Sequence, residues 1–373
     1  MEVVVTGIGL VSALGSSLES SWQQLVAGKS AIKLQQPFAE LKQLPLALIS
    51  QQPAYLQTLT RLVVSAAIAD AGLKLPLVDC GVAIGSSRSY QAAWERLARQ
   101  VDSSDDWLDT LPHMNAIASA GQIGASLVPI LAPMAACATG IWAIFQGYQL
   151  IKTGQCQRVI AGAAEAPVTP LTIVGFDRMG ALAQTGSYPF DLNRQGLVLG
   201  EGGAVLVLES AKLATERSAR IYGQILGFGL TADAYYANKP DIKGTSAIAA
   251  VKQCLERAGL SPADIDYIHA HGTATPIGDR HEAQLINYLF PQVRVSSTKG
   301  ATGHTLGASG AIGAAFCLQA LQQQILPPCV GLQQPEFDLN LVTQGDRSKI
   351  NRALCFSFGF GGQNAVMALA KYE

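Results

Sequence analysis

Short apolar runs alternate along this chain with longer segments whose apolar residues recur every three or four positions. The short runs predict strands, and the longer segments predict helices. The pattern gives strands at 2–5, 78–85, 158–163 and 203–208 and helices at 18–27 and 59–71. After residue 219 it starts again, with strands at 221–228, 267–269, 353–357 and 365–370 and helices at 245–258 and 280–289. We therefore expect an α/β protein of two units, 1–219 and 220–373, which share an interface because no linker-like tract separates them.

Two long stretches, 114–151 and 300–335, carry no Asp, Glu, Lys or Arg. Glycine and proline interrupt both of them, so neither offers the roughly 20 unbroken apolar residues of a membrane helix. A strand-like run lies within the first stretch, at 130–136, and another lies directly before the second, at 294–299. Each run leads through a turn into a helix of small residues. Small side chains let another helix or a sheet approach closely. We expect two central buried helices and no membrane span.

Composition narrows the class of protein. Charged residues make up 14% and apolar residues 49% of the 373 residues, which indicates a compact globular chain. The 26 Lys and Arg nearly balance the 27 Asp and Glu, so we expect no nucleic-acid partner. The seven cysteines form no C-x-x-C pair, and the first residues lack the basic region of a secretory signal. We therefore expect a cytoplasmic protein without a disulfide framework.

Two short motifs suggest local structure or chemistry. Gly7-Ile-Gly9 follows the first strand as a dinucleotide fingerprint would, but Ser12 replaces the third glycine, and we interpret the motif as a tight turn. Cys137 stands at a predicted strand-to-helix turn, where backbone N–H groups and the helix dipole favour a thiolate. It is therefore a candidate nucleophile with a lowered pKa. The alternative is a small apolar residue of a packed core, which most buried cysteines are.

A histidine-rich motif, His269-Ala-His271, ends a predicted strand, and a helix that begins near Asp279 follows it. Ligands of α/β sheets gather at the carboxyl ends of strands, which favours a functional role for His271. We interpret His269 as a packed strand residue and His281 as a surface residue. We expect no metal, because these histidines point along different elements and no cysteine or carboxylate set has ligand spacing.

Two further motifs could carry function. Lys299 and His304 lie in an otherwise uncharged segment, and burying either one unpartnered costs several kcal/mol. We therefore expect Asp279 or Glu282 as their partners. The segment 356–364 interleaves glycine with phenylalanine, which is typical either of a hairpin or of a mobile gate that presents backbone N–H groups.

In chain order, these motifs resemble those of the elongating β-ketoacyl-acyl-carrier-protein synthases, the KAS I/II type of the thiolase-like superfamily. The resemblance runs nearly end to end and rests on Val5-Thr-Gly-Ile-Gly-Leu-Val-Ser12, Ala136-Cys-Ala-Thr-Gly140, Pro189-Phe-Asp191, Gly200-Glu-Gly202, His271-Gly-Thr-Ala-Thr275, Ser297-Thr-Lys-Gly-Ala-Thr-Gly-His304 and Phe358-Gly-Phe-Gly-Gly362. It implies a thiolase-like fold, in which two similar halves form a five-layered αβαβα sandwich, and it implies a homodimer.

The resemblance also implies a site. Cys137 would be the acylated nucleophile, His271 and His304 would engage the malonyl thioester, and Lys299 would complete the catalytic set. The other implied residues are Asp279 and Glu282 behind the catalytic groups, Thr273 and Thr275 at the pantetheine arm, Phe176 at the acyl pocket wall, Phe358 and Phe360 in the gating loop, and the backbone N–H groups of Cys137 and Phe360 as the oxyanion hole.

The implied reaction is a decarboxylative Claisen condensation of an acyl thioester with malonyl-carrier protein, in fatty-acid or related biosynthesis. The implied partner is an acyl carrier protein, with Arg61, Arg88 and Arg178 as candidate docking contacts, and no cofactor is required. One alternative is a specialised polyketide or aryl-polyene ketosynthase, which shares every motif. Another is a non-catalytic chain-length subunit, in which the nucleophile is replaced. A heterodimer with a related subunit is the alternative to the homodimer. A degradative thiolase would need a second cysteine in the C-terminal loop, and Cys355 lies before it.

Three single positions and one segment depart from the family pattern. Gly313 stands where these synthases commonly carry a glutamate, Ala138 where Ser or Thr often follows the nucleophile, and Gly180 where an arginine often contacts the carrier. Gly85-Ser-Ser-Arg-Ser-Tyr90 replaces a glycine-rich strand end that lines the acyl pocket. We therefore expect an altered charge network near the histidines and a specificity that departs from housekeeping fatty-acid synthesis.

Overall fold

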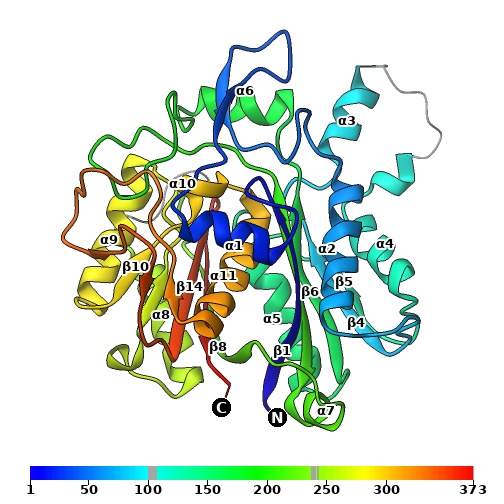
Figure 1. Ribbon diagram of the computed structural model, residues 1–373. Coiled ribbons are helices and arrows are strands. Elements are labelled where there is room, and N and C mark those ends of the chain that lie inside the picture. Colours follow the sequence, from blue (N-terminus) through cyan, green and yellow to red (C-terminus); the bar gives the residue numbers. More distant parts are fainter. Residues whose placement is uncertain (100–106, 237–240, 242, 373) are drawn as a thin grey trace.

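The computed structural model describes residues 1–99, 107–236, 241 and 243–372, and most of its strands form one long sheet (Figure 1). The strand order is β12-β10-β9-β14-β15-β8-β1-β7-β6-β4-β5. These strands are β1 (Val3–Ser12), β4 (Cys80–Gly85), β5 (Ile130–Leu131), β6 (Arg158–Glu165), β7 (Gly202–Ser210), β8 (Gly223–Ala232), β9 (Tyr267–His269), β10 (Arg294–Ser296), β12 (Asn340–Leu341), β14 (Arg352–Gly359) and β15 (Gln363–Ala370). Two separate hairpin-like pairs are β2 (Lys33–Gln35) with β3 (Leu44–Leu46) and β11 (Ile325–Leu326) with β13 (Asp346–Arg347).

The long sheet consists of two units with the same topology. Apart from the edge strand β12, which pairs with β10, the strand orders of the two units are β1-β7-β6-β4-β5 and β8-β15-β14-β9-β10. When the strands of each unit are numbered along the chain, both orders are first, fifth, fourth, second, third. In each unit the second strand pairs in parallel with the third and fourth, and the remaining pairs are antiparallel. The units meet where β1 and β8 pair through Val3, Val4 and Val5. The expected pair of similar halves is thus confirmed, and a domain boundary near residue 219 stays a prediction.

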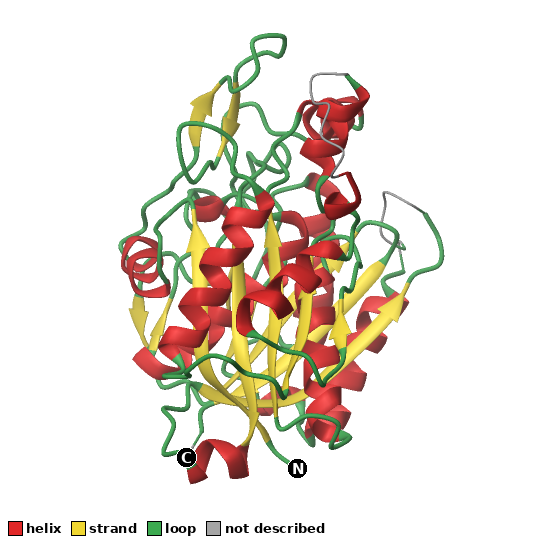
Figure 2. Ribbon diagram, turned by 90° about the vertical axis from the view of Figure 1, so that its right-hand side faces the viewer, coloured by secondary structure: helices red, strands yellow, loops and turns green. Residues whose placement is uncertain are grey.

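Helices cover both faces of this sheet and also lie between its two units (Figure 2). The helices are α1 (Leu18–Val26), α2 (Leu56–Asp70), α3 (Gln91–Ala98), α4 (Met114–Ile123), α5 (Thr139–Lys152), α6 (Pro170–Arg178), α7 (Ala211–Glu216), α8 (Thr245–Ala258), α9 (Pro276–Leu289), α10 (Lys299–Thr302) and α11 (Ser309–Gln323). Helices α2 and α4 pack on the outer face of the first unit, and α8 and α9 pack on that of the second. Helices α5 and α11 contact each other and both units. The result is the expected five-layered arrangement of helix, sheet, helix, sheet, helix.

The two central helices approach each other through glycines. A Cβ atom at Gly140 of α5 would lie 2.5 Å from the backbone nitrogen of Ala311, and one at Gly310 of α11 would lie 2.8 Å from Cγ1 of Ile141. Real Cβ atoms do not approach other atoms this closely, so the small residues are what permits the contact. Because Cys137 immediately precedes α5 and His304 lies shortly before α11, this contact brings two distant sequence segments together.

Two local predictions are wrong. The glycines at 7 and 9 make no turn, since β1 continues to Ser12, and a Cβ atom at Gly9 would lie 1.9 Å from the carbonyl oxygen of Val63 on α2. These glycines therefore serve the packing of a helix on the strand. The strand expected over 130–136 is only β5, because Pro133 cannot donate a ladder hydrogen bond.

Within the described ranges, we find no helix that combines the length and the apolar character needed to cross a membrane. Both chain termini lie at one end of the molecule, and the β2–β3 pair lies at the opposite end (Figure 2). The long charge-poor stretches instead form α5, α11 and their neighbours, which are largely buried.

Candidate active site

Cys137 lies in the turn between β5 and α5 and lines a cavity of about 430 Å³. The preceding residue, Ala136, has a φ of 46°, a left-handed conformation that is uncommon for a residue with a side chain. The hydroxyl of Thr139 accepts a hydrogen bond from the Ala135 nitrogen at 2.8 Å and donates one to the Ala136 oxygen at 2.7 Å. The hydroxyl of Ser357 donates to the Cys137 oxygen at 2.8 Å. These bonds hold the strained turn in place.

Two histidines meet Cys137 in this cavity. His271 follows β9, His304 follows α10, and their ring centroids are 5.3 Å apart at an angle of 81°. Nδ1 of His304 lies 2.9 Å from the hydroxyl of Ser309, and Nδ1 of His271 lies 3.5 Å from Nζ of Lys299. One ring nitrogen of each histidine and Sγ of Cys137 all lie within 4.8 Å of one another. The structure thus brings together three residues that are far apart in the sequence.

Burial dominates the titration of the cysteine. The apolar surroundings raise the pKa of Cys137 to about 11, while the Lys299 ammonium and the backbone N–H of Phe360 act in the opposite direction. The pKa lowering expected from the helix start is therefore wrong, because loss of hydration outweighs it. At neutral pH the group is a thiol, and a nucleophilic role requires a base beside it.

The histidines can serve as that base. Burial, followed by the positive charge of Lys299, holds the pKa of His271 and that of His304 well below the usual range for histidine. Both imidazoles are therefore neutral at pH 7. The ammonium of Lys299 also contacts the carbonyl oxygen of His271, and burial lowers the pKa of this lysine. A neutral imidazole can accept a proton on one nitrogen and donate one from the other.

Asp279 and Glu282 hold the loop that carries His271. The two oxygens of Glu282 accept hydrogen bonds from the backbone nitrogens of His271 and Gly272, each at 2.6 Å. Those of Asp279 accept from Ala274 at 3.0 Å and from Phe190 at 2.8 Å. Burial raises the pKa of Asp279 to about 6 and also raises that of Glu282. Their direct partners are thus backbone N–H groups, whereas we had expected Lys299 and His304 in that place.

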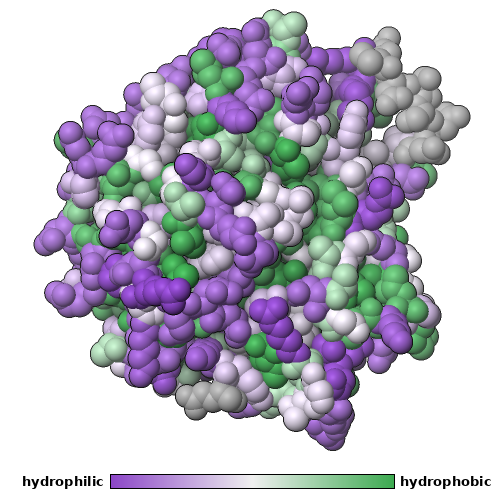
Figure 3. Space-filling model, in the orientation of Figure 1, coloured by the Kyte–Doolittle hydropathy of each residue, from purple (hydrophilic) through white to green (hydrophobic). Residues whose placement is uncertain are grey.

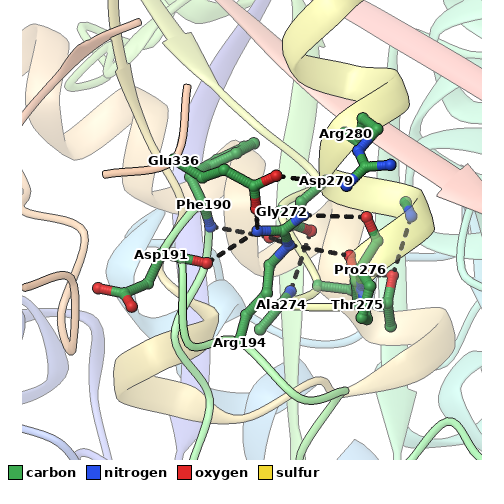
Figure 4. Close-up of polar contacts among 12 residues, drawn as sticks. Phe190, Asp191, Arg194, Gly272, Ala274, Thr275, Pro276, Asp279, Arg280 and Glu336 are labelled. Carbon is green, nitrogen blue, oxygen red and sulfur yellow. Dashed lines mark hydrogen bonds and ion pairs between the residues drawn. The ribbon is translucent and has the colours of Figure 1, made fainter. Parts of the chain in front are cut away.

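The sequence analysis did not single out Arg194, whose guanidinium lies against the start of α9 (Figure 4). Its guanidinium donates to the carbonyl oxygens of Asp191 at 2.8 Å and Pro276 at 3.0 Å, and it forms an ion pair with Glu336. It lies 3.9 Å from the carboxylate of Asp279. In the sequence, only the neighbouring motif Pro189-Phe-Asp191 had indicated that the segment around Arg194 could be functional. Arg194 ties that motif to the helix whose first turn supports His271.

Glu165, at the end of β6, is a second functional neighbour that the sequence did not single out. Its buried carboxylate accepts hydrogen bonds from the Ser86 hydroxyl at 2.6 Å and from the backbone nitrogens of Ser87 at 2.7 Å and Gly307 at 3.1 Å. It therefore joins the unusual segment 85–90 to the turn that follows His304. The guanidinium of Arg88, from the same segment, lies 5.5 Å from the ring centroid of Phe176.

The remaining expected residues lie around the same cavity. Those that line it are Phe176, Thr273, Thr275, Phe358 and Phe360. The hydroxyls of the two threonines are 3.0 Å apart, and the rings of Phe176 and Phe360 are 5.9 Å apart. A Cβ atom at Gly359 would lie 3.0 Å from the Cys137 nitrogen, so this glycine lets the aromatic loop approach the nucleophile. His281, expected at the surface, is half-buried and also lines the cavity.

Cys137, His271 and His304 also have the ligand types and the spacing that a zinc ion accepts. Within the described ranges they are the one such group of three. The absence of a metal from the working site stays a prediction.

Comparison with known proteins decides the family. The model of the "Beta-ketoacyl synthase, N-terminal domain" matches residues 1–214, and that of the "Beta-ketoacyl synthase, C-terminal domain" matches residues 222–333. The chain belongs to the β-ketoacyl synthase family. It is 33% identical to 3-oxoacyl-(acyl-carrier-protein) synthase 2 of Coxiella burnetii over 99% of this chain and 98% of that protein. It is 31% identical to the synthase of the same name from Staphylococcus aureus over 100% and 99%.

A solved structure described as a type II PKS acyl-carrier protein in complex with its ketosynthase bound to the hexaketide matches this β-ketoacyl synthase with a TM-score of 0.92. The two are 27% identical, and the match covers 100% of this chain and 99% of that one. The resemblance inferred from the motifs is thus confirmed. Since the cysteine and both histidines are present and converge, the chain is an acyltransferase, a 3-oxoacyl-acyl-carrier-protein synthase, and not a non-catalytic chain-length subunit.

Proposed function

We propose that this β-ketoacyl synthase extends a carrier-bound acyl chain by a decarboxylative Claisen condensation at Cys137. The observation that carries the proposal is the approach of Sγ to two neutral imidazoles within 4.8 Å, in an otherwise largely apolar cavity. A histidine accepts the thiol proton as the sulfur attacks the acyl thioester. The bond between the acyl carbon and the carrier sulfur then breaks, and the histidine returns the proton to the carrier sulfur. The carrier leaves as a thiol, and Cys137 keeps the acyl group.

The backbone N–H groups of Cys137 and Phe360 stabilise the oxyanion of this step. Support comes from the Phe360 N–H, which points to the cysteine sulfur, and from Gly359, which lets that loop lie against Cys137. Donors fixed before the reaction stabilise a developing negative charge without reorganisation. The loop with Phe358 and Phe360 acts as the gate, Phe176 forms the wall of the acyl pocket, and the hydroxyls of Thr273 and Thr275 receive the pantetheine arm.

The second half-reaction uses the histidines as donors. The Lys299 ammonium faces Nδ1 of His271, which makes that nitrogen an acceptor and leaves the proton on Nε2. Nε2 of His271 and of His304 then donate to the carbonyl oxygen of the malonyl thioester. The bond to the malonyl carboxylate breaks, carbon dioxide leaves, and the electron pair forms the new bond to the acyl carbon as the thioester to Cys137 breaks. The Cys137 sulfur leaves as a thiolate and takes up one proton, which restores the thiol. Asp279 and Glu282 keep the His271 loop in place.

We propose an acyl carrier protein as the partner and a homodimer as the assembly. Arg61 and Arg178 are exposed and could meet an acidic carrier, whereas Arg88 lies against Phe176. Apolar side chains gather on the side of the molecule that bears α2 and α4 (Figure 3). The exposed large apolar residues between positions 55 and 134 include Tyr55, Leu62, Leu75, Val78, Trp94, Leu97, Trp107, Leu108, Ile117, Leu127 and Met134. Such a surface fits a subunit contact next to the edge strand β5.

One observation favours a second candidate, a specialised polyketide-type ketosynthase. The Arg88 guanidinium lies against Phe176, so a positive charge adjoins the expected acyl pocket. A cation there favours a polar or acidic acyl chain over a plain alkyl chain.

The division into units 1–219 and 220–373 and a cytoplasmic location also stay proposals.

Intact-protein mass spectrometry tests the function. The enzyme is mixed with acyl-carriers of graded length and polarity, and Cys137→Ala is the control. We expect an acyl mass on the parent only, its loss on addition of malonyl-carrier, and release of carbon dioxide with a β-ketoacyl product. Preference for oxygenated chains would support the second candidate. A parent protein that accepts no acyl group from any carrier would overturn the proposal.

A further inference from the structure

Gly313, the glycine that departs from the family pattern, makes room for two other side chains. A Cβ atom at this position of α11 would lie 2.8 Å from Cε1 of His269 and 2.9 Å from Sγ of Cys355. Both distances are far below ordinary contact, so any side chain at 313 would displace one of these groups. His269 and Cys355 are also direct neighbours across the parallel strands β9 and β14. An imidazole and a thiol therefore share one fully enclosed place behind the catalytic histidines.

The His269 ring is more than a packing group. It is 2% exposed, and its Nε2 lies 3.1 Å from the hydroxyl of Thr298. Its Nδ1 is buried and has no hydrogen-bond partner among the described residues. A buried polar atom of this kind costs about 1–3 kcal/mol, so its presence calls for an explanation. Nδ1 of His269 and Sγ of Cys355 each lie 2.9 Å from the position that a Cβ atom at Gly313 would take, so both groups pack around the same space. The thiol itself donates to the carbonyl oxygen of Gly310 at 3.7 Å.

A chain of contacts leads from this pair to the active site. Thr298 directly precedes Lys299, and its carbonyl oxygen accepts hydrogen bonds from the nitrogens of Ala301 at 2.9 Å and Thr302 at 3.0 Å. It thereby begins the short helix α10. Lys299 in turn contacts the carbonyl oxygen and Nδ1 of His271. The Thr298 hydroxyl is thus one residue away from the lysine that sets the tautomer of a catalytic histidine.

The pair also belongs to the same electrostatic cluster. Contact with Cys317 and with His269, together with the charge of Lys299, lowers the pKa of Cys355 despite its burial. Cys355 in turn favours the charged form of Lys299. The charge of Lys299 on α10 and the thiol of Cys355 on β14 therefore influence each other, and this interaction does not depend on substrate.

We propose that His269 and Cys355 are positioning residues, which hold the Thr298 hydroxyl and thereby fix Lys299 against His271. This role rests on the proposed function of His271 as a donor to the malonyl thioester. The Cys355 side chain packs beside the His269 ring, the Thr298 hydroxyl lies at Nε2 of that ring, and Gly313 provides the space for both groups. Loss of one neutral hydrogen bond in this chain of contacts lowers the rate of the histidine-dependent step about fivefold to tenfold.

The test compares variants that keep or remove one polar group, which is the hydroxyl at 298, the Nε2 position at 269 or the thiol at 355. Thr298→Val removes the hydroxyl without changing the shape, and Thr298→Ser restores it. His269→Gln places an amide nitrogen near the position of Nε2, whereas His269→Leu does not. Cys355→Ala removes the facing thiol, and Cys254→Ala, on α8, is the control for loss of a buried thiol. Carbon dioxide release from malonyl-carrier and acylation of Cys137 are measured separately, with thermal midpoints alongside.

We expect Thr298→Val, His269→Leu and Cys355→Ala to slow carbon dioxide release about fivefold to tenfold, with an unchanged KM and acylation within about twofold. Thr298→Ser, His269→Gln and Cys254→Ala should stay near the parent rate. Carbon dioxide release by Thr298→Val at the parent rate, from a folded protein, would overturn the positioning role and leave the function intact. A parent that releases none would overturn the proposed function instead. Ring ¹⁵N resonances of His271 decide the positioning role without substrate: they should shift in Thr298→Val, and an unchanged spectrum would overturn it.

Discussion

The contact between α5 and α11 should couple stability to catalysis, and Gly140→Ala tests this coupling. The added carbon would lie 2.5 Å from the Ala311 nitrogen, 3.0 Å from the Ala311 Cβ and 3.2 Å from the Gly307 oxygen. Ordinary contacts begin near about 3.5 Å, so the two helices must separate by about 1 Å. Overpacking of this kind costs about 1–3 kcal/mol of unfolding free energy.

The same shift should reach the reacting groups. Cys137 lies two residues before α5, and the segment from His304 leads into α11. A change of about 1 Å in the distance between a nucleophile and its base can cost about 100-fold in rate. We therefore expect Gly140→Ala to lower the rate of Cys137 acylation by about ten-fold to 100-fold while the protein still folds.

Urea denaturation and single-turnover acylation are the assays. Gly121→Ala is the matched control, because Gly121 lies on the exposed side of α4 with no atom within 4 Å of its added carbon. That change should raise stability by up to about 1 kcal/mol and leave the rate alone, since alanine favours a helix more than glycine does. If Gly140→Ala matches the parent in both stability and rate, the two helices accommodate the added carbon without separating. The expected coupling of stability to catalysis is then wrong.

Three further predictions concern the site. His271→Ala and His304→Ala should each slow carbon dioxide release about 10²- to 10³-fold while Cys137 still becomes acylated, and decarboxylation at the parent rate would contradict the two-histidine mechanism. Because the pKa of Cys137 is about 11, its thiolate fraction and its iodoacetamide labelling rate should rise about tenfold per pH unit between pH 7 and 10. A flat profile would show that the sulfur is already ionised. Gly361→Val, at a φ of 76° with open space around it, should slow acylation through backbone strain without unfolding the protein, and an unchanged rate would show the loop to be only structural.

The sequence alone determined most of the regular structure, because the signals for it are local. The helix over 245–258 and the strand over 267–269 have the bounds that their patterns predicted. The motifs around Cys137, His271 and His304 likewise predicted the family and the chemistry, since short segments of fixed residue type are sufficient for that inference. The small residues of the two charge-poor stretches correctly indicated a close central pair of helices.

Only the tertiary structure decided how these segments affect one another. The helix start beside Cys137 is visible in the sequence and favours a thiolate, yet the raised pKa comes from apolar groups that many distant segments contribute. The glycines at 7 and 9 suggested a turn, and their real reason is the approach of α2. From its sequence context, His269 was interpreted as a packed strand residue. The structure places Gly313, Cys355 and Thr298 around its ring. Burial and close contact depend on which surfaces meet in three dimensions. A local sequence pattern does not contain this information.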